Sequence, residues 1–187
     1  MNKSNALSLI KEKTQNSNLV KHMLAVAACM KALAKHFDAD EDKWEIAGLV
    51  HDADYEMFKN DPKKHPSLIF EWLEKDGYDK DIIHAVKAHA WGWREDLPKP
   101  ESKMDWSIFC CDELTGFIIA VTLMRPTKKI SDTTVESVLK KWKKKEFARG
   151  VIRENIEMCE SELGIKLPDF IQICLTAMQE ISKDLGL

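Results

Sequence analysis

The segment GLVHDADYE, residues 48–56, carries the pair His51 and Asp52 directly after an apolar run. A histidine, His22, lies 29 residues earlier in VKHMLAVAACM, and an aspartate, Asp112, lies 60 residues later in IFCCDELTGF. All three neighbourhoods are apolar, and an imidazole or a carboxylate there is costly unless something pairs with it. Two imidazoles and two carboxylates brought together would form a mixed nitrogen and oxygen site for a divalent transition metal ion. We therefore predict that these four side chains meet at a metal site.

Each of these residues also has a purely structural explanation. His22 shares the apolar stripe of its helix with Leu19 and Val26, where a lone histidine is more often a core residue than a ligand. A His-Asp dipeptide is common by chance, and Asp112 could lie at the edge of a buried face, paired with Arg or Lys. The combination is far more specific than any single member.

The order His…His-Asp…Asp resembles the HD-domain superfamily of metal-dependent phosphohydrolases, named after its metal-binding His-Asp pair. The resemblance covers about residues 19–155. It includes HDADYEMFKNDPKKHPSLIFEWLEKDGYDKDIIHAVKAHA, and DELTGFIIAVTLMRP is similar to a group of small, largely uncharacterised HD hydrolases. It implies a helical fold, and the metal ligands that it implies are His22, His51, Asp52 and Asp112.

The resemblance also implies a second group of site residues. His65 and His89 match histidines that begin one helix and end the next in many members, and with Asp52 they would hold a second ion. If only one ion binds, they would contact the substrate phosphate instead. Many relatives read His-Asp-x-Gly-Lys, with the lysine near that phosphate, whereas this chain has ADY at 53–55. Asp54 is our candidate for orienting the attacking water, the alternative being an ordinary turn residue.

Positive charge for the phosphate must then come from elsewhere in the chain. The run KKWKKKEFAR, residues 140–149, is either a solvated helix face or a phosphate-binding edge. Arg125 is the strongest candidate because it follows the helix of Asp112. On a continuous helix, Lys145 and Arg149 would share one face. The residues that we expect to bind the phosphate are Arg125, Lys128, Lys145 and Arg149.

Helical geometry separates two histidines of one predicted helix. His84 and His89 are five residues apart, which leaves them about 140° apart around the axis. His89 shares its face with Ile82 and Val86 and should point inward, whereas His84 lies beside the charged Lys80. The alternative for His89 is a cation at a helix C-terminus.

The composition describes one domain of ordinary size, with 187 residues of which 44% are apolar. A net charge of −3 points to neither nucleic acid nor an acidic membrane as partner. Five cysteines without a CxxC spacing indicate buried or free thiols in a reducing compartment. The opening stretch MNKSNALSLIKEKTQ does not resemble a signal peptide. We predict a cytoplasmic protein.

Helical patterns run through the whole chain, and no alternating strand pattern is long enough for a sheet. We predict a single all-α domain over residues 1–187, a compact HD-type helical bundle with a core at about 19–155 and C-terminal helices packed on it. The apolar stretch 104–124 contains three acids, which favours a buried core helix over a membrane span. The predicted helices are 6–13, 17–36, 42–50, 66–77, 80–90, 103–123, 151–163 and 169–185. A further helix, between 123 and 151, begins with a capping box at 133–136. The predicted loops are 52–65, 91–102 and 125–132.

These observations predict a metal-dependent phosphohydrolase that acts on a small, nucleotide-like phosphate ester. A divalent ion lowers the pKa of its bound water and offsets charge on the phosphoryl oxygens. Mixed ligands favour Mn, Fe, Co, Ni or Zn over Mg, as one or two ions. Two other classes stay open, a non-catalytic HD-type nucleotide sensor and a metal-dependent oxygenase on the same fold. Trp91 and Trp93 either pack in the core, wall a pocket or stack on a base.

Overall fold

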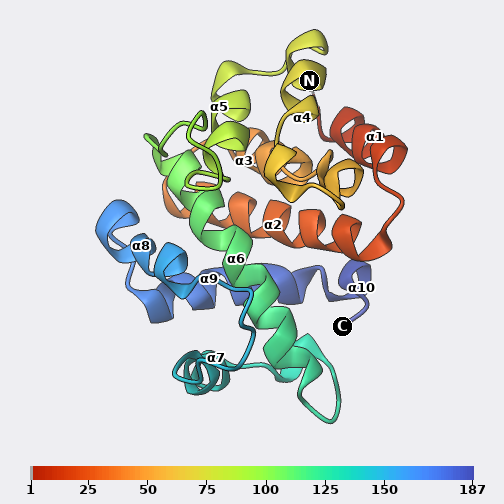
Figure 1. Cartoon of the computed structure of the whole chain (residues 1–187). Coiled ribbons are helices and arrows are strands. Elements are labelled where there is room, and N and C mark those ends of the chain that lie inside the picture. The colour runs from red at the N-terminus through yellow and green to blue at the C-terminus, as the bar shows by residue number, and fades with distance from the viewer. Residues whose placement is uncertain (1) are drawn as a thin grey trace.

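The computed structural model describes residues 2–187, and its regular elements in that range are all helical apart from one isolated bridge between Trp91 and Arg94 (Figure 1). The predicted all-α fold is confirmed. In chain order the elements are α1 (Lys3–Lys13), α2 (Ser17–His36), α3 (Glu41–Val50), η1 (Tyr55–Phe58), η2 (Pro62–Lys64), α4 (Leu68–Lys75), α5 (Lys80–Ala88), α6 (Lys103–Leu123), η3 (Ile130–Asp132), α7 (Val135–Trp142), α8 (Arg153–Leu163), α9 (Leu167–Glu180) and α10 (Ser182–Leu185), where η marks a short 3₁₀ helix.

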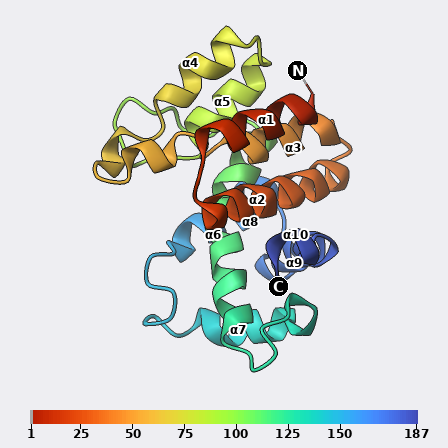
Figure 2. The ribbon, with the colours of Figure 1, turned by 90° about the vertical axis from the view of Figure 1, so that its right-hand side faces the viewer.

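Helix α2 forms the centre of the fold and packs against α3, α6 and α9. Figures 1 and 2 both place α1, α3, α4 and α5 around one end of α6, with α7 at its other end. Met30 and Leu33 of α2 are fully buried, as are Leu49 of α3 and Phe117 of α6. Each such side chain contributes about 1.5–3 kcal/mol of hydrophobic stabilisation. This packing brings α2, the end of α3 and the middle of α6 together.

Helix α6 is the one helix in residues 2–187 whose length and composition would allow it to cross a membrane. In the fold, 67% of its most apolar window is buried, against α2, α8 and α9. Its acidic residue Asp105 belongs to a capping box with Ser102 rather than to an exposed face. The predicted core helix is therefore confirmed.

The second predicted helix, 17–36, matches α2, and Asn16 caps it because its side chain accepts from the backbone of Asn18. One predicted helix start is wrong because a different side chain caps the helix. The predicted capping box of Thr133 and Glu136 lies one residue later, at Thr134 and Ser137. Thr133 itself points inward, and its hydroxyl lies 2.9 Å from that of Thr122.

Two further boundaries differ from the prediction. The fourth helix begins at Leu68 rather than at Pro66, because the Asp54 carboxylate accepts hydrogen bonds from the backbone of Ser67 and Ile69. The last predicted helix is broken at Ile181, which separates α9 from α10.

All five cysteines are buried free thiols, as predicted. Burial raises the pKa of Cys159 to about 12, so its thiol stays protonated and chemically inert near neutral pH.

Candidate metal centre

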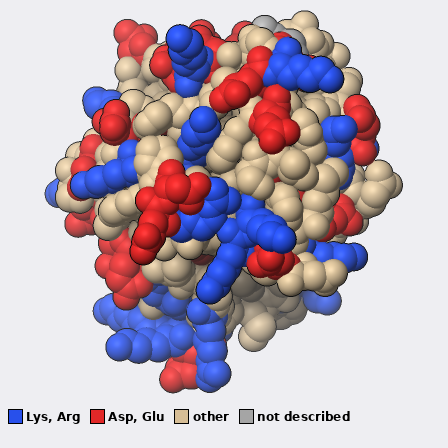
Figure 3. Space-filling view, turned by 45° about the horizontal axis from the view of Figure 1, so that its top comes forward, with Lys and Arg blue, Asp and Glu red and all other residues tan. Residues whose placement is uncertain are grey.

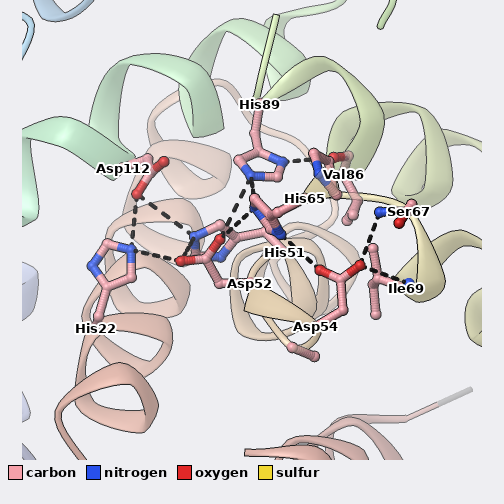
Figure 4. Close-up of polar contacts among 12 residues, drawn as sticks. His22, His51, Asp52, Asp54, His65, Ser67, Ile69, Val86, His89 and Asp112 are labelled. Carbon is pink, nitrogen blue, oxygen red and sulfur yellow. Dashed lines mark hydrogen bonds and ion pairs between the residues drawn. The ribbon is translucent and has the colours of Figure 1, made fainter. Parts of the chain in front are cut away.

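The four predicted ligands converge from three helices (Figure 4). His22 lies in α2, Asp112 lies in α6, and His51 and Asp52 directly follow α3. Nε2 of His22 lies 2.9 Å from Oδ1 of Asp112, and Nε2 of His51 lies 3.6 Å from the same oxygen. Oδ2 of Asp52 is 3.6 Å from Nε2 of each of these histidines. The structure therefore brings together four residues that span 91 positions of sequence.

A second group shares Asp52 with the first. Its Oδ1 lies 3.0 Å from Nε2 of His65 and 3.7 Å from Nε2 of His89. The two Nε2 atoms of these histidines are 3.3 Å apart. His22, His51 and Asp112 can thus hold one ion, and Asp52, His65 and His89 can hold another. Asp52 directs one oxygen toward each group.

The close approach of α3 to α2 depends on Gly48. A Cβ at this position would lie 2.8 Å from the Cα of Ala27, a distance that real Cβ atoms do not adopt. The absence of a side chain lets the end of α3 deliver His51 next to His22. The Gly48 carbonyl then accepts a 2.8 Å hydrogen bond from Nδ1 of His51.

The two helix ends orient two of the histidine rings in the same way. The last carbonyls of a helix lack a partner within the helix. Gly48 near the end of α3 and Val86 near the end of α5 accept hydrogen bonds from Nδ1 of His51 and His89, the latter at 2.6 Å. In the neutral ring this leaves the Nε2 lone pair of each histidine facing Asp52.

Side chains orient the other two rings. Nδ1 of His65 donates to Oδ1 of Asp54 at 2.7 Å. Nδ1 of His22 lies 3.3 Å from the Thr115 hydroxyl, which itself donates to the Asp112 carbonyl at 2.9 Å and so accepts from the ring. All four histidines therefore present Nε2 to the two carboxylates, which is the arrangement in which metal-binding histidines are usually held.

Two contacts test whether these residues fit a metal ion. Nε2 of His51 is buried and has no hydrogen-bond partner among the described residues. The Nε2 atoms of His65 and His89 face each other, although both rings donate through Nδ1. Each of these buried Nε2 atoms needs either a proton that it shares with a carboxylate or a bound cation in its place, because buried polar atoms need a partner. The residues present fit divalent metal binding.

The carboxylates control the charge of the buried rings. Burial by itself would lower the pKa of His51 and of His65. Asp52 and Asp112 nevertheless raise the pKa of His51 to about 9. Asp52 and Asp54 raise the pKa of His65 to about 9 in the same way. Burial and the neighbouring imidazoliums lower the pKa of His89. Without an ion, the site therefore holds protons on Nε2 that metal binding must displace.

The structure corrects the predicted role of Asp54. Its side chain is fully buried, with Oδ1 bonded to His65 and Oδ2 accepting from Ser67 at 2.8 Å and Ile69 at 3.1 Å. Both oxygens already have partners. Burial by itself would raise the pKa of this carboxyl, but the hydrogen bond and charge of His65 and the two backbone donors lower it. Asp54 therefore positions His65 and joins the site to the start of α4, instead of facing a water.

The predicted phosphate-binding residues are not gathered in one place. Arg125 and Lys128 lie past the far end of α6, and Arg125 is 13 residues beyond Asp112, or about 20 Å along the helix. Lys145 and Arg149 share no helix face, because α7 ends at Trp142. Basic side chains gather at the lower left of Figure 3, toward the end of the molecule that carries α7 in Figure 1.

The segment of Arg149 nevertheless passes beside α6. Ile152, three residues later, donates its backbone N–H to Oε2 of Glu113 at 3.3 Å, and Glu113 is the neighbour of Asp112. Phe147 packs against Phe117 of the same helix, with ring centroids 5.3 Å apart. Arg149 is exposed on this segment.

His84 of α5 and His89, which directly follows α5, separate as predicted. His89 is buried in the second group, whereas His84 is half-buried and pairs at 3.0 Å with Asp105, outside both groups. Trp91 packs against Trp106, but Trp93 is 46% exposed, with its ring centroid 6.0 Å from that of His65.

Sequence reasoning missed Thr115 as a site residue. It lies three residues after Asp112 on the same helix and orients His22. A spacing of three residues places Asp112 and Thr115 on one helix face. This spacing could have identified Thr115 from the sequence.

Comparison with known proteins agrees with this site. The family model described as HD domain matches residues 19–115, which include all six residues of the two groups. The chain belongs to the HD domain family, whose members are in general metal-dependent hydrolases. The match ends well before residue 155, where the resemblance was expected to end.

Similar curated proteins carry the name Ribonuclease Y. The protein from Oleidesulfovibrio alaskensis is 32% identical over 111 residues, 59% of this chain and 20% of that protein. The one from Lawsonia intracellularis is 27% identical over 99 residues, 53% of this chain and 18% of that protein. The chain thus spans about a fifth of the length of these relatives.

Proposed function

We propose that this protein is a phosphohydrolase that uses two divalent transition metal ions to hydrolyse a small, nucleotide-like phosphate ester. The observation that carries the proposal is the position of Asp52, which directs one carboxylate oxygen to each of two groups of Nε2 atoms. A carboxylate in this position can bridge two ions, the arrangement that suits displacement at a phosphoryl group.

Each residue group has a defined role in this proposal. His22, His51 and Asp112 hold one ion, and Asp52, His65 and His89 hold the other. When bound, the ions supply a water of lowered pKa and offset charge on the phosphoryl oxygens. Imidazole and carboxylate ligands favour manganese, iron, cobalt, nickel or zinc over magnesium.

The ligand set also accounts for the missing lysine after the His-Asp pair. Four neutral imidazoles and two carboxylates do not cancel the charge of two divalent ions, so the loaded site attracts anions. Asp54 holds the His65 ring so that its Nε2 faces Asp52. Substrate access is from the side of His22 and Asp112, whose side chains are each 23% exposed.

A second candidate substrate is an RNA phosphodiester. It is favoured by the relatives named Ribonuclease Y, whose similarity covers more than half of this chain. The net charge of −3 weighs against it, because backbone phosphates are bound chiefly by basic surfaces.

The test is a substrate panel with a defined metal supply. Chelator-treated protein is reloaded with Mn²⁺, Fe²⁺, Co²⁺, Ni²⁺, Zn²⁺ or Mg²⁺, then assayed on phosphomonoesters, nucleotides, cyclic nucleotides and a short RNA. We expect a transition metal to support mononucleotide hydrolysis, and Asp52→Asn to abolish it. Cleavage of RNA alone supports the second candidate. Nucleotide binding without turnover, or a product that forms only with dioxygen, overturns the proposal in favour of a sensor or an oxygenase.

A further inference from the structure

A pocket of about 440 Å³ adjoins the metal centre. It lies between the first half of α2, the second half of α6 and the turn that follows α10, elements that meet near the C-terminus in Figure 1. The residues that line it are Asn18, Lys21 and His22 of α2, Gly116, Ile119 and Leu123 of α6, and residues 185–187. Its volume is in the range of small-molecule sites.

Both helical walls of this pocket carry a predicted metal ligand. On α6, residues 112, 116, 119 and 123 follow one another at spacings of four, three and four, so they lie on one helix face. On α2, Asn18 is four residues before His22 and shares its face. The pocket therefore continues directly from the His22 and Asp112 side of the centre.

The exposure of the ligands agrees with this direction. The side chains of His22 and Asp112 are each 23% exposed, whereas that of His51 is 0% exposed. His65 and His89 are nearly as inaccessible. The accessible side of the centre is therefore that of His22 and Asp112, and His22 lines the pocket.

The space next to the centre is kept open by Gly116. Apart from its chain neighbours and the backbone of its own helix, no atom of residues 2–187 lies within 4 Å of where its Cβ would be. Ile119 and Leu123 continue this wall as apolar surface, and Leu123 is 49% exposed. The pocket can therefore accept an apolar or aromatic body beside the phosphate.

Lys21 is the cation of this pocket. Its ammonium takes part in no ion pair or side-chain hydrogen bond with any residue in 2–187. Nζ lies 2.9 Å from where a Cβ of Gly186 would be, so the ammonium lies over the turn that closes the pocket. A cation without a partner in a largely apolar pocket selects an anionic group on the ligand.

We infer that this pocket binds the leaving-group portion of a phosphate ester, and that Lys21 pairs with a second anionic group carried by that portion. The ligand class is a nucleotide-sized ester with two separate anionic groups, one at the metal centre and one at Lys21. The inference deepens the proposed function and rests on it for the position of the scissile phosphate.

The experiment measures binding rather than turnover. Metal-loaded protein is titrated by calorimetry with adenosine 3′,5′-bisphosphate, adenosine 5′-monophosphate and inorganic phosphate. Lys21→Met removes the charge but keeps the aliphatic stem, and Lys35→Met, on the exposed end of α2, is its control. Gly116→Leu fills the pocket, and Gly116→Ala is its control because a Cβ meets open space there.

We expect Lys21→Met to weaken bisphosphate binding about tenfold, the effect of one lost charge-assisted hydrogen bond, and to leave the affinity for inorganic phosphate unchanged. Gly116→Leu should weaken both nucleotides and spare inorganic phosphate. Equal effects of Lys21→Met and Lys35→Met, or wild-type nucleotide binding by Gly116→Leu, overturn the inference. If wild-type protein binds phosphate but neither nucleotide, the inference fails while the proposed function stands. Lys21-dependent binding without hydrolysis of any ester contradicts the proposed function alone.

Discussion

Nδ1 of His65 lies 2.7 Å from Oδ1 of Asp54, and this hydrogen bond determines which nitrogen of His65 faces Asp52. Because Nδ1 donates to Asp54, Nε2 is the nitrogen that faces Asp52, 3.0 Å from its Oδ1, and it can bind a metal once its proton is displaced. Asp54 is itself anchored by two backbone donors at the start of α4. The buried carboxylate therefore connects the helix that follows the His-Asp loop to the metal centre.

The substitution Asp54→Asn tests this connection. The amide oxygen can still accept from Ser67 and Ile69, but the amide nitrogen would donate to Nδ1 of His65 and move its proton to Nε2. We expect metal affinity at the Asp52, His65 and His89 group to fall roughly 10- to 100-fold. Metal titration followed by elemental analysis measures this. Unchanged affinity at both groups would show that the Asp54 contact does not set the ring orientation.

The bridging position of Asp52 predicts a graded loss of metal. We expect about two equivalents of a first-row transition metal per chain in wild type, if both groups fill. His22→Ala and His89→Ala should each remove about one equivalent. Asp52→Ala should remove most of the metal, because Asp52 contacts histidines of both groups. His36→Ala, at the exposed end of α2, is the control. Metal content that is the same in all variants would rule out the site.

His84 of α5 and His89 at the end of that helix provide a matched pair for activity. His89→Ala removes a ligand atom of the second group, whereas His84→Ala removes only the partner of Asp105. We expect His89→Ala to lower kcat at least 100-fold, as for other residues that hold a catalytic ion, and His84→Ala to change it little. Steady-state kinetics on the ester identified by the panel gives both values. Similar losses in the two variants would contradict the assigned site.

The basic residues of the C-terminal half are expected to differ in their effects. Arg149 lies on the segment whose Ile152 contacts Glu113 beside Asp112, but Arg125 lies past the far end of α6. Arg149→Ala should raise KM several-fold with metal content intact, because a guanidinium near the phosphate would be lost. Arg125→Ala should leave KM unchanged. A wild-type KM in both variants would show that these basic residues form a solvated surface and do not bind the phosphate.

The stability of the metal-free protein should fall as pH rises from about 6.5 to 9. The carboxylates around His51 and His65 raise the pKa of each ring from 6.5 to about 9. Folding is therefore favoured by these protons below pH 6.5, and this contribution is lost as pH rises through 9. Metal-loaded protein has no such protons to lose. Thermal unfolding across this window should show Tm falling for chelated protein only, and parallel curves would contradict the prediction.

Much of the site could be predicted from residue types and local spacing. The order of His22, His51, Asp52 and Asp112 indicated the ligands, because imidazole and carboxylate groups in apolar segments need a partner. Helical phase alone placed His89 inward, since a helix fixes the angle between residues five apart. The all-α fold followed in the same way from apolar periodicity and the scarcity of turn residues.

Contacts between distant segments could not be derived in this way. The donors to Asp54 lie 13 and 15 residues along the chain, so its role depends on where α4 begins. Thr133 and Thr134 compete to cap α7, and the buried contact of Thr133 with Thr122 decides between them. Local sequence contains no information on either contact.

The sequence by itself determined which chemical groups are available and which face of each helix they occupy, because both depend on residue type and on a fixed helical repeat. Only the tertiary structure decided that Asp52 divides its two oxygens between two groups, and that Arg125 lies away from the site, past the end of α6. It also placed Lys21 over a pocket that opens from His22. These relations depend on how α2, α3 and α6 pack, and packing sums many weak contacts between residues far apart in the chain.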